Sequence, residues 1–206
     1  LEPFFNRFTP LADEQLAAGL HAVAERAGAP VKEILVADAS RRTNKVNAYV
    51  SGLGASRRVV VWDTLLDAVG VPEVEVVVAH ELGHRRLHHV AKFSAVGMAL
   101  AAAVVVLLRL VLGTPAPGDL PTALLLVLAA QAAISPCFSA YSRRYERQAD
   151  AFACGVTRDL AAFERLMVEL ARRNLGDLQP PRLAYLFLFT HPTAPERLAF
   201  ARTLQL

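Results

Sequence analysis

The N-terminal part of the chain alternates between helical and extended patterns of apolar side chains. Residues 11–27 carry apolar side chains three or four positions apart and are followed by Gly28, which predicts a helix that ends there. Three short runs rich in β-branched residues come next, and Gly52 and Gly54 between the last two predict a hairpin. These expected strands are Glu33–Ala37, Asn47–Leu53 and Arg57–Trp62.

A second helical region follows the expected strands. Asp63 or Thr64 can cap a short helix that ends near Gly70. Pro72 is suited to the first turn of the next helix, because proline lacks the backbone N–H that a helix start leaves unused. We expect that helix to run through the sequence HELGH to about Val90.

Two long apolar runs occupy the middle of the chain, at Phe93–Leu112 and Leu120–Phe138. Each is about twenty residues long, which is the length that a helix needs to cross a bilayer. The segment between them is rich in proline and glycine and predicts a tight connection. The alternative is a helical hairpin buried in a soluble core, but runs of this length without a polar face favour a membrane hairpin.

The remainder of the chain is again helical in pattern. We expect one helix through Cys154, one over residues 157–174, and shorter ones near residues 182–189 and 194–204. The chain therefore divides into an N-terminal part (residues 1–92), a membrane hairpin (93–138) and a helical part (139–206), which we expect to form one domain.

Composition supports a polar domain joined to a few membrane helices. Hydrophobic residues make up 54% of the chain and charged residues 20%, with a mean hydropathy of +0.33. The net charge of +3 is small, and the basic residues lack the interleaved aromatic side chains of a nucleic-acid surface. We therefore expect a lipid bilayer as a partner and no nucleic acid.

Basic residues flank the hairpin on one side, and its connecting loop has none. The flanking residues are Arg85, Arg86, Lys92, Arg143, Arg144 and Arg147. Loops rich in lysine and arginine remain in the cytoplasm. The sequence therefore predicts a multi-pass protein of the cell membrane in which the polar part on both sides of the hairpin, residues 1–92 and 139–206, faces the cytoplasm.

The sequence HELGH has the form His-Glu-x-x-His. On a helix, His80 and His84 project from one face and can offer two imidazole nitrogens to one zinc ion. Glu81 lies beside them, where its carboxylate can take a proton from a zinc-activated water. The alternative is a pair of solvated histidines on an amphipathic helix. The apolar run that leads into the motif argues against it, because buried polar groups need partners.

A third ligand can come from the helix that follows the hairpin. Leu87 and Val90 stand where a metzincin needs glycine and histidine, so that class is excluded. Glu146 can bind zinc, while Asp150, four residues on, can accept a hydrogen bond from a ligand imidazole. The alternative is that Glu146 only pairs with a neighbouring arginine. Two membrane runs of similar length return the chain to its starting side, which favours the zinc site.

Five motifs in order give the chain a wider resemblance. They are FFNRFTPLADEQL, NAYVSGLGASRRVVVWDTLL, HELGHRRLHH, SRRYERQADAFA and HPTAPERL. With them the chain resembles the membrane zinc metallopeptidases that include the CAAX prenyl proteases and the HtpX-type heat-shock proteases, and more closely the CAAX branch. The resemblance implies one zinc ion per chain held by His80, His84 and Glu146, with Glu81 as base and Asp150 in support.

The resemblance also implies roles for residues that spacing alone does not single out. His191 would help to stabilise the oxyanion, and Arg197 would order the acidic residues around the metal. Asn47, Ala48 and Tyr49 would form an edge strand that pairs with an extended substrate.

Two departures from the family pattern stand out. Larger CAAX-type members have further membrane helices ahead of the region that matches Leu1, so the chain is expected to be a C-terminal catalytic portion of a longer protein. Arg85 follows His84 where prenyl proteases often have an aromatic residue, which bears on the substrate class.

The sequence therefore predicts an α+β, mainly α, zincin-like metallopeptidase with a small β-sheet and a two-helix transmembrane hairpin insertion. Its function would be zinc-dependent endopeptidase activity, of CAAX type, on a peptide or protein substrate that is prenylated or membrane-bound. An HtpX-like quality-control protease of membrane proteins and a non-enzymatic zinc-binding membrane sensor are the alternatives.

Overall fold

The computed structural model describes residues 7–52, 54–114 and 116–204. Residues Phe4–Asn6 of the FFNRFTPLADEQL motif, and Leu53 at the end of an expected strand, lie outside that description. The chain forms two compact units. The first comprises the chain up to Leu87, residues 145–179 and the chain from Pro192; the second comprises residues 88–144 and 180–191.

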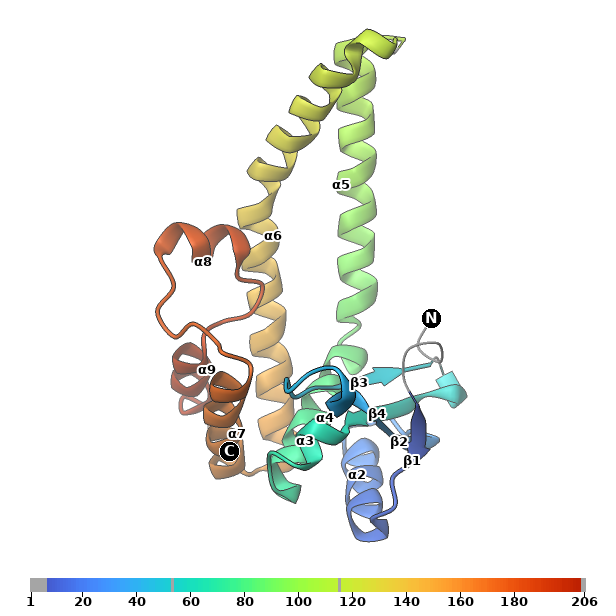
Figure 1. The fold of residues 1–206 in the computed structure, drawn as a ribbon, viewed down its shortest axis with the longest axis vertical. Coiled ribbons are helices and arrows are strands. Elements are labelled where there is room, and N and C mark those ends of the chain that lie inside the picture. The colour runs from blue at the N-terminus through green and yellow to red at the C-terminus, as the bar shows by residue number, and fades with distance from the viewer. Residues whose placement is uncertain (1–6, 53, 115, 205–206) are drawn as a thin grey trace. The chain divides into compact units, whose positions relative to one another are not determined.

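A four-stranded sheet in the order β1-β2-β4-β3 forms part of the first unit (Figure 1). Its strands are β1 (Phe8–Pro10), β2 (Glu33–Ala37), β3 (Ala48–Ser51) and β4 (Arg58–Trp62). Strands β3 and β4 form the expected antiparallel hairpin, whereas β2 pairs with β4 in parallel. The three-residue β1 is not evident from the sequence, because a strand that short shows no periodicity; it is defined by its antiparallel pairing with β2.

Alternate residues of the sheet enter two apolar clusters. Ile34, Val59 and Val61 face the large core, while Leu35 and Val60 face a smaller cluster on the other side. Helix α2 (Glu14–Arg26) begins at Asp13, whose carboxylate accepts a hydrogen bond from the Leu16 N–H, and adds its buried leucines to the large core. The period of two along the strands thus gives the sheet its two faces.

The helix that carries HELGH, α4, runs over Val71–Arg86. It ends earlier than the sequence predicted, because His88 adopts a left-handed conformation at a φ of 57° and separates α4 from the next helix, α5 (His89–Leu112). The short helix α3 (Asp63–Leu66) begins after Trp62. Asp63 lies inside it and accepts a hydrogen bond from the Ser40 backbone rather than capping the helix.

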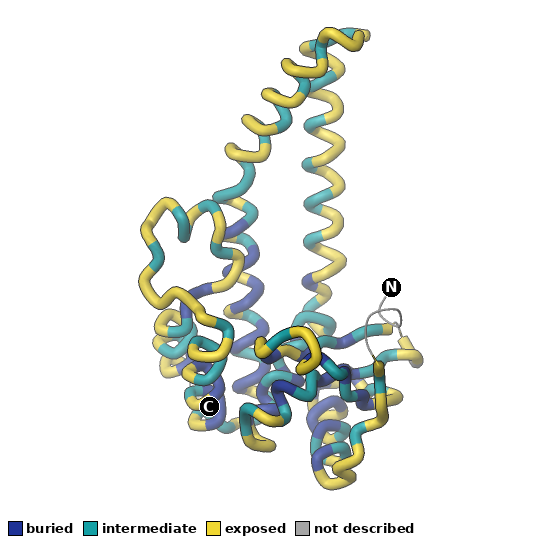
Figure 2. The backbone as a smooth tube through the Cα atoms, in the orientation of Figure 1, coloured by how far each residue is buried: buried dark blue, intermediate teal, exposed yellow. Residues whose placement is uncertain are grey.

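The expected membrane runs lie in α5 and in the first half of α6 (Leu120–Thr157). Both helices are long and apolar enough to cross a membrane, with mean hydropathies of 2.6 and 1.8 over their most apolar windows. Figure 2 shows both of them exposed over most of this apolar length. Their length and apolar character suit a location in a membrane.

Helix α6 is longer than the sequence predicted. It continues through Pro136 as one helix of 38 residues, so the apolar run and the segment with Glu146 and Asp150 belong to the same helix. Proline inside a helix removes one backbone hydrogen bond, which an otherwise continuous apolar helix tolerates. The remaining helices are α7 (Leu160–Arg173), α8 (Arg182–Leu188) and α9 (Ala194–Ala201). The expected fold class, mainly α with a small sheet and an apolar helical hairpin, is confirmed.

Candidate metal centre and active site

Helix α4 holds the HELGH motif at the border of the large core. Val74, Val78 and Leu82 on this helix are buried, which fixes the rotation of α4 about its axis. His80 and His84, four residues apart, then project together from the side of α4 that remains partly exposed.

Three side chains with metal-ligating atoms converge beside α4. Nε2 of His80 and Nε2 of His84 lie 3.1 Å apart. Each also lies 3.4 Å from a carboxylate oxygen of Glu146, which α6 supplies from within the same unit. Glu146 is only 6% exposed, so its carboxylate faces the two rings rather than solvent.

Asp150 and Arg197 fix the orientation of the His80 ring on its Nδ1 side. The Nδ1 atom of His80 lies 3.0 Å from the Asp150 carboxylate, which is fully buried. Arg197 donates hydrogen bonds to both oxygens of Asp150, through Nε at 2.9 Å and through Nη2. With Nδ1 directed at Asp150, the Nε2 atom of His80 is directed at Glu146 and His84.

The start of α9 sets the position of Arg197. The Thr193 hydroxyl accepts a hydrogen bond from the Glu196 N–H, and the Glu196 carboxylate accepts one from the Thr193 N–H. This reciprocal capping box fixes the first turn of α9. Arg197 follows directly, and its guanidinium therefore reaches Asp150 from a fixed backbone.

Charge around the centre shifts the pKa values of its groups. Burial alone would lower the pKa of His80, but its contacts with Asp150 and Glu146 outweigh burial and raise that pKa to about 9. Burial would raise the pKa of Asp150, but Arg197 and His80 hold it well below its usual range. Burial raises the pKa of Glu81. Burial thus favours the protonated form of Glu81 over its carboxylate.

The chain matches the family model described as peptidase family M48 over residues 10–205. The chain belongs to this family. It is 31% identical to the "Uncharacterized metalloprotease YhfN" of Bacillus subtilis over 98% of its own length and 50% of that protein. It is 28% identical to "CAAX prenyl protease 1" of Saccharomyces cerevisiae, over 95% of this chain and 49% of that protein.

A solved structure shares the fold. The crystal structure of Ste24p from S. mikatae matches with a TM-score of 0.84 and 28% identity, covering 97% of this chain and 52% of that one. The chain thus spans about half the length of the relatives that it matches.

Membership of a metalloprotease family implies a metal cofactor, and the residues present fit one. Ligands about 2.0–2.2 Å from one tetrahedral ion stand roughly 3.3–3.6 Å apart. The two imidazole Nε2 atoms stand 3.1 Å apart, and each lies 3.4 Å from a different carboxylate oxygen of Glu146. One ligand atom from each of His80, His84 and Glu146 can be chosen so that all three lie within 4.8 Å of one another, which is compact enough for one ion. Two imidazoles and a carboxylate form a donor set suited to a borderline transition metal.

Strand β3 is an edge strand of the four-stranded sheet and contacts α4. Asn47 accepts a hydrogen bond from Trp62 on β4, so the backbone groups of Ala48 and Val50 point to the outer edge. The Ala48 N–H is bound by the Asn47 side chain at 2.9 Å, and Arg85 donates to the Val50 carbonyl. Sequence reasoning missed this contact of Arg85, because only the fold brings the end of α4 beside β3.

His191 belongs to the second unit, where its Nδ1 lies 3.0 Å from the Thr190 hydroxyl. Its expected role at the oxyanion stays a prediction. The structure does bring together Glu81, His80, His84, Glu146, Asp150 and Arg197, all of which lie in the first unit.

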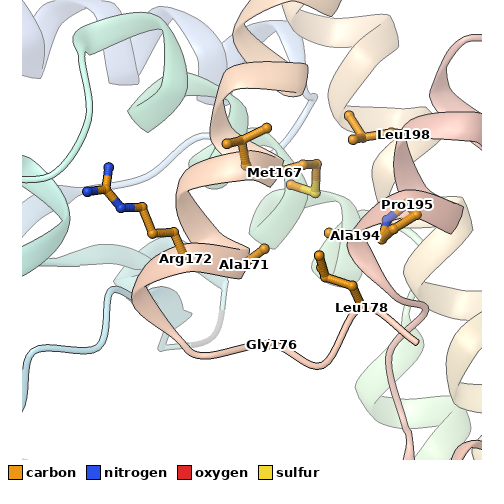
Figure 3. A pocket seen from close by; sticks show the side chains of 9 residues that line it. Met167, Ala171, Arg172, Gly176, Leu178, Ala194, Pro195 and Leu198 are labelled. Atoms are coloured by element: carbon orange, nitrogen blue, oxygen red, sulfur yellow. The ribbon is translucent and has the colours of Figure 1, made fainter. Parts of the chain in front are cut away.

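An apolar cavity of about 310 Å³ lies elsewhere in the first unit (Figure 3). Met167 and Ala171 of α7 line it together with Leu198 of α9. The predicted site residues are not among those that line it. Helix α9 therefore presents Arg197 to Asp150 and the adjacent Leu198 to this cavity.

Proposed function

We propose that this chain is the catalytic part of a zinc-dependent membrane endopeptidase of CAAX type. The observation that carries the proposal is the convergence of His80, His84 and Glu146 beside Glu81 within one unit of an M48 fold. Two imidazoles and a glutamate are the ligand set of catalytic zinc sites that leave one coordination position open. We expect one zinc ion per chain.

Zinc at this position would supply a Lewis acid that polarises water and the scissile carbonyl. Glu81 is the general base that takes a proton from the attacking water and later delivers it to the leaving amine. Its raised pKa suits both steps, since a carboxylate with a higher proton affinity is a stronger base. Asp150 and Arg197 keep the His80 ring in place during these transfers.

The substrate would lie along β3 as an added strand. The outer edge of β3 offers the backbone groups of Ala48 and Val50, and main-chain hydrogen bonds of this kind bind extended peptides without regard to sequence. A substrate strand that pairs there would donate a hydrogen bond to the Val50 carbonyl in place of the one from Arg85. Asn47, Ala48 and Tyr49 would thus set the register in which the substrate strand pairs with β3. His191 would stabilise the developing oxyanion.

The CAAX assignment rests on the relatives named as CAAX prenyl proteases and on the two apolar helices that would keep the protease beside lipid-anchored substrates. The basic residues that flank the hairpin favour a catalytic unit facing the cytoplasm. Prenylated C-terminal peptides are membrane-bound and cytoplasmic, so both features suit that class of substrate.

The experiment that tests the base and the substrate class uses Glu81→Gln in the purified, lipid-reconstituted protein. We expect wild-type protein with stoichiometric zinc to cleave a prenylated CAAX peptide faster than an unfolded membrane protein. Glu81→Gln should keep its zinc and lose at least about 100-fold in kcat, because the general base is gone. Glu75→Gln on the same helix is the matched control and should retain activity.

Each other outcome contradicts one part of the proposal. Wild-type turnover by Glu81→Gln would show that Glu81 is not the base. Preference for the unfolded protein would favour a quality-control protease. Stoichiometric zinc without cleavage of either substrate would favour a membrane sensor.

A further inference from the structure

Helix α8 (Arg182–Leu188) is a short apolar helix that hydrogen bonds attach to α6 within the second unit. The hydroxyls of Ser135 and Ser139 donate to the Phe187 carbonyl at 2.7 and 3.2 Å. Figure 1 shows α8 beside α6 at this height. Two serines one turn apart thus satisfy a carbonyl at the C-terminal end of α8, where a helix leaves its carbonyls unpaired.

Arg143, one further turn along α6, completes this attachment. Its guanidinium donates to the carbonyls of Tyr185 and Phe189 at 3.2 and 2.7 Å. The same group stacks over the Tyr185 ring, with its Cζ 4.4 Å from the centroid. Arg143 is only 7% exposed. A buried arginine bound to carbonyls and a ring fixes the position of α8 on α6.

The exposed surface of α8 is apolar. Leu183, Leu186 and Leu188 are 72%, 40% and 74% exposed. Every residue from Leu183 to Leu188 is aliphatic or aromatic. An exposed apolar helix whose polar contacts all lie on one side needs a partner that accepts apolar side chains without hydrogen bonds.

The position along α6 at which α8 is attached indicates which partner that is. The apolar run Leu120–Phe138 of α6 is roughly 28 Å long at 1.5 Å per residue, close to the thickness of a hydrocarbon core. Ser135, Ser139 and Arg143 therefore lie where this run ends and basic and aromatic residues begin, including Tyr141 and Arg144. Such residues mark the headgroup region of a bilayer.

We propose that α8 is an interfacial helix that inserts its leucines into the cytoplasm-facing leaflet beside α6. Arg182, at the first turn, would stay among the headgroups, while Leu183, Leu186 and Leu188 enter the acyl region. Helix α8 ends three residues before His191, so lipid contact also anchors the segment that leads into HPTAPERL. A protein or peptide partner on the same leucines is the competing occupant, and the experiment below separates the two.

The experiment measures the depth of α8 by spin labelling of the protein in phosphatidylcholine vesicles. The background carries Cys137→Ser, which removes the exposed thiol. Labels are placed at Leu183→Cys and Leu186→Cys. Leu125→Cys on the apolar run of α6 and Val168→Cys on α7 are references of comparable exposure, 67% and 60%. The measurement is the accessibility of each label to oxygen and to a water-soluble nickel chelate.

We expect both α8 labels to be accessible to oxygen and protected from the chelate, at depths about 5–10 Å below the headgroups. Their oxygen-to-chelate ratio should resemble that of Leu125→Cys rather than that of Val168→Cys. Chelate accessibility at α8 equal to that of Val168→Cys would overturn the proposal. Protection that appears only when a peptide substrate is added, in detergent as in vesicles, would identify a peptide-binding surface instead.

A second variant checks that the leucines themselves hold the helix in lipid. Leu186→Ser combined with Leu188→Ser leaves the serine and arginine contacts of α6 intact, so α8 stays attached. We expect the label at Leu183→Cys to become shallower in this background. An unchanged depth would show that the attachment to α6, and not the apolar face, sets the position, and the proposal would be wrong.

Discussion

At the scale of single residues, a hydrogen-bonded chain connects the metal centre to the C-terminal helix. It runs from His80 to Asp150 and on to Arg197, and Asp150 is fully buried between the other two. A buried carboxylate is costly unless it is paired, and here it is paired on both sides. The chain therefore holds one ligand imidazole in a single orientation, which a metal site requires.

The same contacts make metal binding depend on pH. In the metal-free protein the raised pKa of about 9 keeps His80 protonated at neutral pH, so a metal ion must displace a proton. We expect the dissociation constant for zinc to fall by about tenfold per pH unit between pH 7 and pH 8.5. Competition with a chelator of known affinity measures it. A dissociation constant independent of pH would contradict this assignment.

Stability of the metal-free protein should change in the opposite direction. Because the pKa of His80 rises from 6.5 to about 9 on folding, its charged contacts stabilise the fold fully below pH 6.5 and are lost as the pH rises through 9. Asp150→Asn is the matched variant. It removes the carboxylate that most raises the pKa of His80. The pH dependence of zinc binding and the pH dependence of stability should therefore both shift to lower pH, while zinc affinity drops by about 10–100-fold.

At the scale of elements, α4 and α6 approach closely at Gly83, where an added Cβ atom would be tightly packed. A Cβ atom on Gly83 would stand 3.0–3.3 Å from three atoms of the Phe152 side chain. This contact brings Glu146, earlier on α6, beside His80 and His84 on α4. The spacing of the ligands therefore depends on how tightly these two helices pack.

Gly83→Ala tests this packing against a control on α6. Gly155→Ala adds the same methyl group where nothing lies within 4 Å, and should stabilise the protein by about 0.5–1 kcal/mol. Gly83→Ala should gain the same helix preference but lose about 1–3 kcal/mol to overpacking, and it should weaken zinc binding. Chemical denaturation and zinc titration measure the two effects. Equal stability of the two variants would show that the α4–α6 contact is loose.

At the scale of the whole molecule, the apolar hairpin lies in the sequence between His84 and Glu146, the proposed second and third metal ligands. Helix α5 leaves the unit after α4, and α6 returns to it with Glu146. Two spans bring the chain back to the same side of a membrane, so the ligands on α4 and α6 can meet. The basic residues at the ends of the hairpin predict that this side faces the cytoplasm.

Labelling of intact cells tests this orientation. In the Cys137→Ser background, Ala116→Cys lies in the exposed loop between the spans and should react with a membrane-impermeant maleimide from outside. Lys32→Cys, whose side chain is 67% exposed in the catalytic unit, should react only after the cells are opened. The reverse pattern would place the catalytic unit outside the cytoplasm.

Local patterns in the sequence predicted much of the fold. Short runs rich in β-branched residues predicted β2, β3 and β4, and the long apolar runs predicted the candidate spans in α5 and α6. Boundaries were less accurate. The end of α4 depends on the left-handed His88, and α6 continues through Pro136, because neighbouring turns and packing decide whether a helix stops.

By itself, the sequence determined the chemistry that α4 can offer, because a separation of four residues places His80 and His84 on one face of any helix. It also determined the apolar spans, whose length alone suits a bilayer. Only the tertiary structure decided that Arg197 binds Asp150, that Arg85 reaches Val50, and that α8 is fastened to α6. These contacts join residues 47, 35 and 42–52 positions apart. No local pattern encodes such distances, because they depend on how whole helices pack.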